Sequence, residues 1–264
     1  MLNKKDIEIR KELAIEVSKD AGRMLLRNFG KISHIKTKSD RNLVTDIDLK
    51  ADEIITSKIK RYFKADNIIS EESPFTDFKS DYTWIIDPLD GTHNYIHNID
   101  IFGVSVGVAF KEEGVIGIIY MPCTDELYVA SKGGSAYCNK RRIYVSERDI
   151  NSATVVFDSS IRHNKKIMLK DLGEVSDRVF NVRMLGSTAR GLTYIAEGKV
   201  EAEIEYNDEV WDYAAGLLLV EEAGGLSTDF KGNRWNIKTK GYIASNKRVH
   251  QGILDIVNSP SPKP

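Results

Sequence analysis

Residues 84–95, Trp-Ile-Ile-Asp-Pro-Leu-Asp-Gly-Thr-His-Asn-Tyr, hold the side chains best suited to chemistry. The apolar start predicts a buried strand, which should end at Asp87-Pro88 because proline cannot donate a ladder hydrogen bond. Asp87 and Asp90 then stand three residues apart, with the Leu89 carbonyl between them. Such oxygen atoms are the ligands that Mg2+ prefers. The stretch therefore predicts a metal site at the carboxyl end of a strand.

The next two residues predict a phosphate site. Gly91 lets the backbone approach an anion closely, and Thr92 supplies a backbone N–H and a hydroxyl. If a helix begins here, its first N–H groups and its dipole favour a phosphate group. The competing interpretation is an ordinary polar turn, since Asp, Pro and Gly are common in turns.

Further acids stand next to apolar segments elsewhere in the chain. Glu71 follows the short apolar run at 68–69, Asp212 opens a strongly apolar helix at 211–220, and Asp48 lies near the start of another expected helix. Each has a plain explanation when taken alone. The glutamate fits a charged surface turn, and an aspartate is common at a helix N-terminus.

The elements that must position these residues indicate a mixed α+β chain. Periodicity predicts helices at 6–29, about 45–63, 188–197, 211–223 and 247–257, and strands at 68–69, 84–86, within 101–131, and at 153–157, 179–185, 200–206 and 242–245. Residues 31–42 are expected to form a polar loop, which can close on a site. Residues 200–206 place Glu201, Glu203 and Glu205 on one face, and that face is expected to meet solvent.

A composition change near residue 145 predicts two subdomains. Residues 1–145 would carry most metal ligands, and 146–258 would carry Asp212 and the substrate contacts. Residues 259–264, rich in Pro and Ser, are expected to be a frayed tail.

Composition limits the classes of function. The chain has 264 residues, 41% of them hydrophobic, and a net charge of -1, which gives no case for nucleic acid or an anionic membrane as partner. No apolar stretch approaches the roughly 20 residues that span a bilayer. The charged amphipathic start is unlike a signal peptide. Two cysteines without metal spacing, Cys123 and Cys138, are most simply reduced thiols, so we expect a cytoplasmic protein.

Taken together, the motifs resemble those of the inositol monophosphatase family, whose members are Mg2+-dependent, lithium-sensitive sugar phosphatases. The matching stretches are Leu43-Val44-Thr45 with Asp48, Ser70-Glu71-Glu72-Ser73, Trp84 to Tyr95, Trp211 to Gly216, and Glu221 with Ala223-Gly224-Gly225. Their order agrees from the first helix to about residue 257, and this joint match outweighs the plain explanation of each motif alone. The resemblance implies a layered αβαβα fold of the sugar-phosphatase type.

The resemblance also implies which residues hold two to three Mg2+ ions. Glu71, Asp87 and the Leu89 carbonyl would hold the first ion. Asp87, Asp90 and Asp212 would hold the second, and Glu71 with water would hold a weaker third.

Catalytic roles follow from the same resemblance. The amides of Gly91 and Thr92 would bind the phosphate, and Thr92 with Asp48 would orient a metal-bound water for in-line attack. Asp48, Thr92 and Glu71 would thus be the catalytic residues.

Substrate contacts are implied less uniquely. Glu205, Ser187 and Thr188 would meet the substrate together with Asp212, while Asp158, Ser159, Ser160, Arg162 and Arg183 are further candidates for the pocket. Either Lys36 or Lys38 fits the lysine of the family's mobile loop. A homodimer is common in the family.

Residues Asn94-Tyr95 resemble inositol monophosphatases and the archaeal-type dual enzymes that also cleave fructose 1,6-bisphosphate. The implied function is therefore hydrolysis of small sugar or polyol phosphates, inositol monophosphate first. Fructose-1,6-bisphosphatase activity, alone or alongside, is the alternative. A 3'(2'),5'-bisphosphate nucleotidase and a non-catalytic binding protein fit the sequence less well.

Overall fold

The computed structural model describes residues 3–31, 35–39 and 42–259, with the backbone alone described for 35–39 and 42–45. The first part of the chain forms α1 (Lys4–Asn28), β1 (Ile35–Ser39), β2 (Asn42–Thr45), α2 (Asp46–Tyr62), β3 (Asn67–Ser70), β4 (Tyr82–Asp90), α3 (Thr92–Ile96), β5 (Gly103–Phe110), β6 (Glu113–Met121), β7 (Glu126–Ser131), β8 (Ala136–Cys138) and β9 (Arg141–Arg142). The second part forms the 3-10 turn η1 (Ile150–Ser152), β10 (Thr154–Phe157), the 3-10 turn η2 (Ile161–His163), α4 (Lys165–Ser176), β11 (Asn181–Arg183), α5 (Thr188–Ala196), β12 (Ala202–Glu205), α6 (Val210–Glu222), β13 (Leu226–Thr228), β14 (Tyr242–Ser245) and α7 (His250–Val257).

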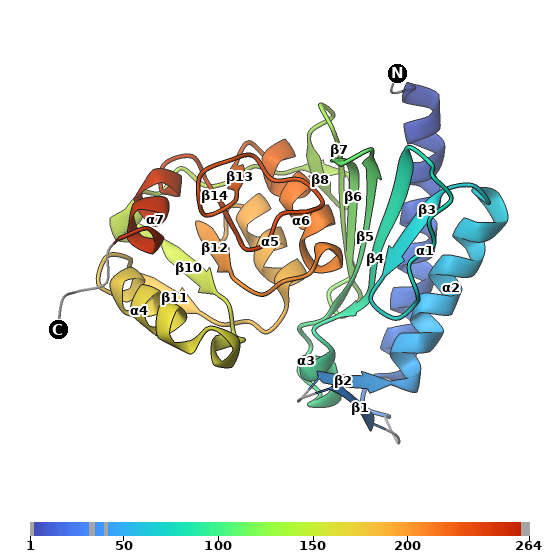
Figure 1. Cartoon of the computed structure of the whole chain (residues 1–264), viewed down its shortest axis with the longest axis horizontal. Coiled ribbons are helices and arrows are strands. Elements are labelled where there is room, and N and C mark those ends of the chain that lie inside the picture. The colour runs from blue at the N-terminus through green and yellow to red at the C-terminus, as the bar shows by residue number, and fades with distance from the viewer. Residues whose placement is uncertain (1–2, 32–34, 40–41, 260–264) are drawn as a thin grey trace.

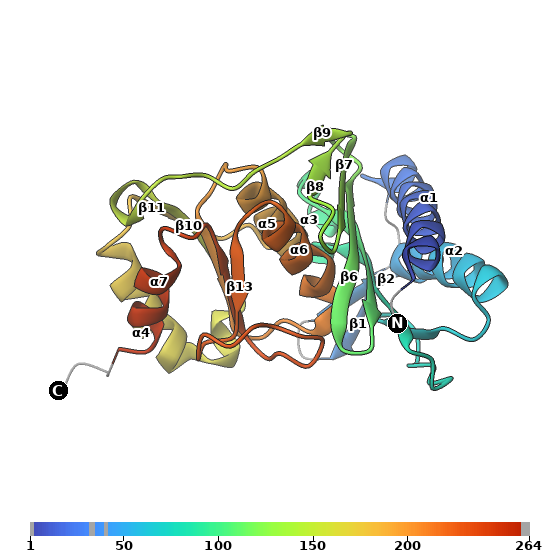
Figure 2. The ribbon, with the colours of Figure 1, turned by 90° about the horizontal axis from the view of Figure 1, so that it is seen from above.

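These elements stack in five layers (Figure 1). Helices α1 and α2 cover one face of a seven-stranded sheet, and α5 and α6 lie between this sheet and a five-stranded sheet. Helices α4 and α7 cover the far face of the smaller sheet, as the view from above also shows (Figure 2). The expected αβαβα fold is therefore confirmed.

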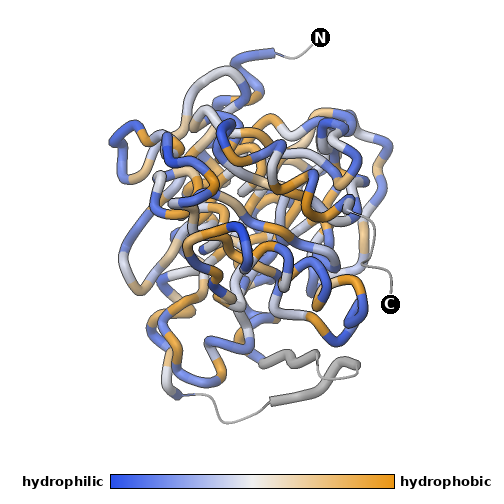
Figure 3. Tube along the Cα trace, turned by 90° about the vertical axis from the view of Figure 1, so that its left-hand side faces the viewer, coloured by the Kyte–Doolittle hydropathy of each residue, from blue (hydrophilic) through white to orange (hydrophobic). Residues whose placement is uncertain are grey.

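Helix α6 is the element that joins the two sheets. Every residue from Tyr213 to Val220 is buried, because the helix is covered on both sides and so is apolar all round. A Cβ on Gly117 of β6 would lie 2.4 Å from the carbonyl oxygen of Ala215, so glycine there permits the close approach of helix and sheet. In Figure 3, hydrophobic stretches gather toward the middle of the molecule and hydrophilic ones lie mainly at its outer turns.

The larger sheet has the order β3-β4-β5-β6-β7-β8-β9, with β3 parallel to β4 and its other pairs antiparallel. The smaller sheet has the order β11-β10-β12-β14-β13, in which β10 runs parallel to β11 and β12. Strands β4 and β12 each have a neighbouring strand on both sides, and their carboxyl ends supply acids to the site described below.

The expectation that the strand ends at Asp87-Pro88 was wrong. Strand β4 continues to Asp90, and its pairing with β5 becomes irregular between Asp87, which pairs with Ser105, and Asp90, which pairs with Gly103. Three steps along β4 are thus matched by two along β5. This bulge accommodates the proline, which has no N–H to donate.

Two further expectations need correction. Residues 31–42 are not simply a loop, because β1 and β2 form an antiparallel pair. The face that carries Glu201, Glu203 and Glu205 does not meet solvent, since their exposed fractions are 0%, 0% and 6%. Strand β12 lies within the smaller sheet, and α5 packs on the face that carries Glu203. Helix α4 and strand β13 were not expected from the sequence.

Some expectations concern residues outside the described part of the chain. The side chains of Lys36 and Lys38 and the tail beyond residue 259 lie outside the described residues. The division at residue 145 stays a prediction. None of the described helices combines the length and apolar character needed to cross a membrane.

Candidate active site

The turn at the end of β4 holds two buried carboxylates. Asp87 is 2% exposed and accepts a hydrogen bond from the backbone N–H of Leu89 at 3.0 Å. Asp90 is 5% exposed and accepts from the Ser187 hydroxyl and, at 3.2 Å, from the backbone N–H of Ala189. Both donors belong to the start of α5, so the N-terminus of this helix fixes the orientation of the Asp90 carboxylate.

Glu71 and Asp212 complete this group of acids. Burial raises the pKa of Asp87 well above its usual range, and the nearby charges of Glu71, Asp90 and Asp212 raise it further. Burial likewise raises the pKa of Asp90 to about 6, although its hydrogen bonds oppose the shift. The structure therefore brings together four acids that lie up to 141 positions apart in the sequence.

This donor set suits a hard divalent cation. All four side chains offer carboxylate oxygens, their mutual repulsion would be relieved by positive charge, and oxygen is the ligand atom that Mg2+ prefers. Among the described residues, no three His, Cys, Asp or Glu side chains already converge as ligands of one ion. The four carboxylates are thus close enough to shift one another's pKa, but their oxygens do not converge on one ion position.

Helix α6 presents Asp212 through its own N-terminal cap. The Asp212 carboxylate accepts a hydrogen bond from the backbone N–H of Glu209 at 2.8 Å, in a capping box at the start of the helix. Burial, followed by the charge of Asp208 and then that of Glu71, raises the pKa of Asp212. From sequence alone, helix capping was a sufficient explanation for Asp212. The structure shows that Asp212 both caps α6 and lies near the other acids.

The backbone turns sharply at Gly91, directly after Asp90. Gly91 has a φ of 80°, and a Cβ at this position would lie 2.7 Å from the carbonyl oxygen of Ile101. The next residue, Thr92, begins α3 as expected. Its hydroxyl lies 3.2 Å from a carboxylate oxygen of Asp48 and 2.9 Å from the Leu89 carbonyl oxygen, and it can donate to either. The structure therefore places Thr92 against both the acid turn and Asp48.

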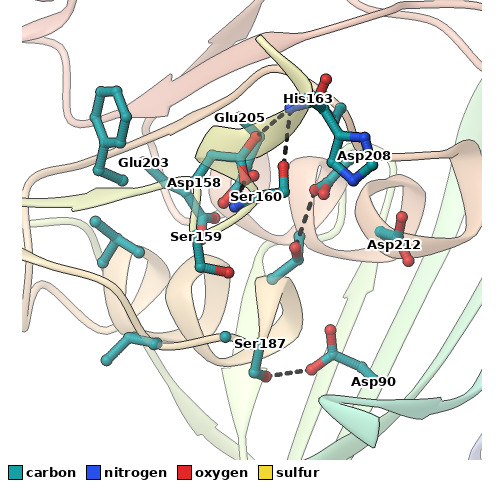
Figure 4. A pocket seen from close by; sticks show the side chains of 16 residues that line it. Asp90, Asp158, Ser159, Ser160, His163, Ser187, Glu203, Glu205, Asp208 and Asp212 are labelled. Carbon is teal, nitrogen blue, oxygen red and sulfur yellow. Dashed lines mark hydrogen bonds between the residues drawn. The ribbon is translucent and has the colours of Figure 1, made fainter. Parts of the chain in front are cut away.

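Beside these acids lies a pocket of about 250 Å³ (Figure 4). It is lined by Asp90, Val156, Phe157, Asp158, Ser159, Ser160, His163, Leu185, Gly186, Ser187, Thr188, Glu203, Glu205, Asn207, Asp208 and Asp212. In Figure 4, Asp90, Asp208 and Asp212 stand on one side, while Asp158, Glu203 and Glu205 stand on the other. The expected substrate contacts Ser187, Thr188, Glu205 and Asp212 all lie in this lining, whereas Arg162 and Arg183 do not.

Sequence reasoning missed two acids of the pocket, Glu203 and Asp208. Asp208 accepts hydrogen bonds from the Thr188 hydroxyl at 2.9 Å and the Tyr242 hydroxyl at 3.2 Å, and burial raises its pKa to about 7. Glu203 shares a strand face with Glu205, so the two-residue period of a strand could have placed both in one pocket. The error was to assign that face to solvent.

Comparison with known proteins gives one consistent result. The model of the inositol monophosphatase family matches residues 6–260. A protein of Thermotoga maritima called fructose-1,6-bisphosphatase/inositol-1-monophosphatase is 32% identical over 94% of this chain and 96% of its own. An inositol-1-monophosphatase of Mesorhizobium japonicum is 34% identical over 93% and 95%. The solved structure of an IMPase from Thermotoga maritima superposes with a TM-score of 0.87 at 31% identity, covering 94% of this chain and 96% of the other.

Proposed function

The chain belongs to the inositol monophosphatase family, and we propose that it uses Mg2+ to hydrolyse small polyol monophosphates, inositol monophosphate first. It is a phosphoric monoester hydrolase of the sugar-phosphate class, as its family and named relatives establish. One observation carries the proposal. Four acids from distant segments meet beside a pocket whose other end is polar and large enough for a ring of hydroxyl groups.

In this proposal, Glu71, Asp87, Asp90, Asp212 and the Leu89 carbonyl would hold the metal. Bound Mg2+ would neutralise charge on the phosphoryl group and make the attacking water more acidic. The protein itself would supply the backbone amides of Gly91 and Thr92 for the phosphate oxygens, at the turn that only glycine fits.

Thr92 and Asp48 would orient the attacking water and accept its proton. Asp48 is 1% exposed, and the Thr92 hydroxyl lies within hydrogen-bond distance of its carboxylate. While Thr92 donates to Asp48, its oxygen can accept a hydrogen bond from the water and so orient it. As the water oxygen bonds to phosphorus, the water would lose a proton through Thr92 to Asp48. The bond from phosphorus to the ester oxygen would break, and the leaving oxygen would take up a proton from solvent to give the alcohol.

The polyol would lie along the pocket, with its hydroxyl groups toward Glu205 and Thr188. Glu205 is 6% exposed and lines the pocket, and burial raises its pKa, with the charges of Asp208 and Asp158 adding to the effect. An acid in this state can either donate to or accept from a hydroxyl group, which suits recognition of a polyol.

Fructose 1,6-bisphosphate is the second candidate substrate. A neighbouring pocket is lined by Lys238 and Lys240 and shares Asn207 and Asp208 with the first, so a second phosphate group would find positive charge there. The Thermotoga maritima relative is named for both activities.

The test is phosphate release with Mg2+ from inositol 1-phosphate, fructose 1,6-bisphosphate and 3'-phosphoadenosine 5'-phosphate, measured side by side. We expect the highest kcat/KM with inositol 1-phosphate. Comparable turnover of both sugars would make the protein a dual enzyme. Cleavage of the nucleotide alone, or of none of the three, would contradict the proposal.

Three further properties stay predictions: a cytoplasmic location, inferred from the cysteines, and a homodimer and lithium sensitivity, which the family suggests. A cytoplasmic location can be tested by cell fractionation, and a homodimer by sedimentation in solution. Sensitivity to lithium can be tested by titrating Li+ into the same phosphate-release assay.

A further inference from the structure

The carboxyl ends of β10 and β12 place two acids next to each other. These strands are parallel neighbours whose pairing runs up to Phe157 and Ile204, and the N–H of Asp158 donates to the Ile204 carbonyl at 3.0 Å. Asp158 follows Phe157 and Glu205 follows Ile204, so the two acids lie across from each other on adjacent strands. Both are buried, and both line the pocket on the same side in Figure 4.

Asp158 has three hydrogen-bond donors from the protein. The backbone N–H of Ser160 donates to one carboxylate oxygen at 2.6 Å. The backbone N–H of Tyr206 and Nδ2 of Asn207 donate to the other oxygen, each at 3.1 Å. Hydrogen bonds of this kind favour the ionised form of a carboxylate, so the protein stabilises a negative charge at Asp158.

Glu205 has the opposite surroundings. Its hydrogen-bond partner among the described residues is Asp158 itself. Burial raises the pKa of Glu205 most, and the charges of Asp208, Asp158 and Glu203 raise it in the same direction. Two carboxyl groups can form a hydrogen bond only if one of them carries a proton. Because the protein donors all lie at Asp158, the proton belongs on Glu205.

The Glu205 carboxyl group also reaches the pocket. Among the described residues, the carboxylate oxygens that are both enclosed and unpaired belong to Glu203, and those of Glu205 do not share this condition. A protonated carboxyl group has one O–H donor, and its other oxygen can only accept a hydrogen bond. Since Asp158 takes the donor of Glu205, the group that Glu205 offers to a ligand in the pocket is a neutral acceptor.

We propose that Asp158 is a positioning residue that holds Glu205 as a neutral carboxylic acid, which donates to Asp158 and accepts a hydrogen bond from a hydroxyl group of the polyol. The inference rests on the proposed phosphatase function and deepens the account of its substrate contacts. It makes the contact selective for a donor on the substrate. A hydroxyl group satisfies it, whereas an ether oxygen or a phosphate oxygen at the same place does not.

The first experiment compares two variants of Glu205 in the Mg2+-loaded enzyme. Glu205→Leu removes both hydrogen bonds, and KM for inositol 1-phosphate should rise by about tenfold. Glu205→Gln should recover most of that loss, because its amide donates to Asp158 and its carbonyl oxygen accepts from the substrate. If Glu205 instead bound the hydroxyl group as an ionised carboxylate, the amide would lose a charge-assisted bond and would recover little.

The second experiment tests Asp158 as the positioning residue. In Asp158→Asn the amide nitrogen meets one of the three protein donors in either orientation, so the contact with Glu205 is disturbed. We expect KM for inositol 1-phosphate to rise by about tenfold, with a much smaller change in kcat. The rise should be several-fold smaller for p-nitrophenyl phosphate, which has no hydroxyl groups. Glu201→Gln, a buried acid outside the pocket, is the control and should affect both substrates alike.

A third measurement observes the proton without turnover. Difference infrared spectra of wild type and Glu205→Gln near neutral pH should show that the variant has lost the C=O band of a protonated carboxylic acid. Glu201 accepts hydrogen bonds from Ser146, from Arg148 and from the Thr154 N–H, so Glu201→Gln should leave that band in place.

Three results would each overturn the inference. They are a Glu205→Gln enzyme that fails to fold or is no better than Glu205→Leu, an equal loss with both substrates in Asp158→Asn, and an infrared band that survives in Glu205→Gln. If Asp158→Asn fails to fold, the Glu205 variants and the spectra still decide. Failure of the proposed function would look different, because the wild-type enzyme would release no phosphate from inositol 1-phosphate while the infrared band still reported the acid pair.

Discussion

Two groups of acids meet in this molecule, and they differ in how their charge is accommodated. The β4 group comprises Glu71, Asp87, Asp90 and Asp212, and the β12 group comprises Asp158, Glu203, Glu205 and Asp208. Burial raises the pKa of members of both groups. The β4 group gathers at a backbone turn suited to a cation. In the β12 group, protein donors pair Asp158 and Asp208, whereas the carboxylate of Glu203 has no hydrogen-bond partner among the described residues.

The difference shows that buried acids are not one kind of feature. In the β4 group, four carboxylates repel one another, and a bound metal ion would relieve this repulsion. In the β12 group, hydrogen bonds from Ser160, Thr188 and Tyr242 hold a polar wall in place around one unpaired carboxylate. The first arrangement suits the chemistry of the phosphate, and the second suits recognition of the remainder of the substrate.

The largest expected effect comes from Asp90→Asn. The amide keeps the size of the side chain and removes the charge needed for the metal, so we expect kcat to fall by about 10³-fold or more, on the scale seen when a group that stabilises charge in the transition state is lost. Folding should survive, because one of four repelling carboxylates disappears. Steady-state phosphate release and thermal unfolding test both parts, and near-normal turnover would refute the proposed metal site.

The β4 group could be predicted from the sequence, whereas half of the β12 group could not. Asp87 and Asp90 stand in one short motif whose residue types already suggest metal chemistry, and Thr92 follows directly. Glu203 lies in a strand whose alternation with acids is also typical of a solvated face. Its burial depends on α5 packing over β12, a tertiary contact that no local pattern records.

The same contrast holds for the fold. Long periodic helices such as α1 and α6 were predicted within a few residues, because their apolar faces are evident. Strand β13 has three residues, and α4 has no side-chain cap at its start, so neither gave a clear signal. The passage of β4 through Pro88 depends on a bulge against β5, which is a property of the pairing and not of the strand alone.

A second prediction concerns pH and Mg2+ together. The raised pKa values, about 6 for Asp90 and about 7 for Asp208, mean that the metal-free folded protein binds more protons than the unfolded chain between about pH 4 and pH 7. Its stability should therefore fall as pH rises through this range. Mg2+ binds the ionised form, so its stabilising effect should grow with pH, reaching about 2.7 kcal/mol at a concentration 100 times its Kd.

Thermal unfolding at pH 5 and pH 8, with and without Mg2+, measures this effect. Calcium-free and magnesium-free protein prepared with a chelator serves as the reference. Stabilisation by Mg2+ that is equal at both values of pH would show that the β4 acids do not carry the linkage.

A third prediction separates Glu203 of β12 from Glu201, the residue just before this strand, by the sign of the stability change. Glu203→Met removes an unpaired buried carboxylate and fills the same space with an apolar chain, so we expect unfolding free energy to rise by about 1 kcal/mol. Glu201→Met leaves the donors of Ser146, Arg148 and Thr154 without an acceptor. The unfolding free energy of this variant should therefore fall by about 2 kcal/mol. Chemical denaturation of both variants tests the pair, and changes of the same sign would contradict the distinction.

The smallest effect should come from an acid outside both groups. Glu112 pairs with Lys238, and the two side chains are 54% and 70% exposed, so solvent screens the interaction and Glu112→Gln should alter stability by less than about 0.5 kcal/mol. Lys238 also lines the pocket next to the β12 acids. Releasing it should therefore raise kcat/KM for fructose 1,6-bisphosphate slightly while leaving inositol 1-phosphate unaffected. Equal changes for both substrates would mean that the second phosphate does not reach this lysine. In that case only the buried charges of the pocket would contribute to substrate selectivity.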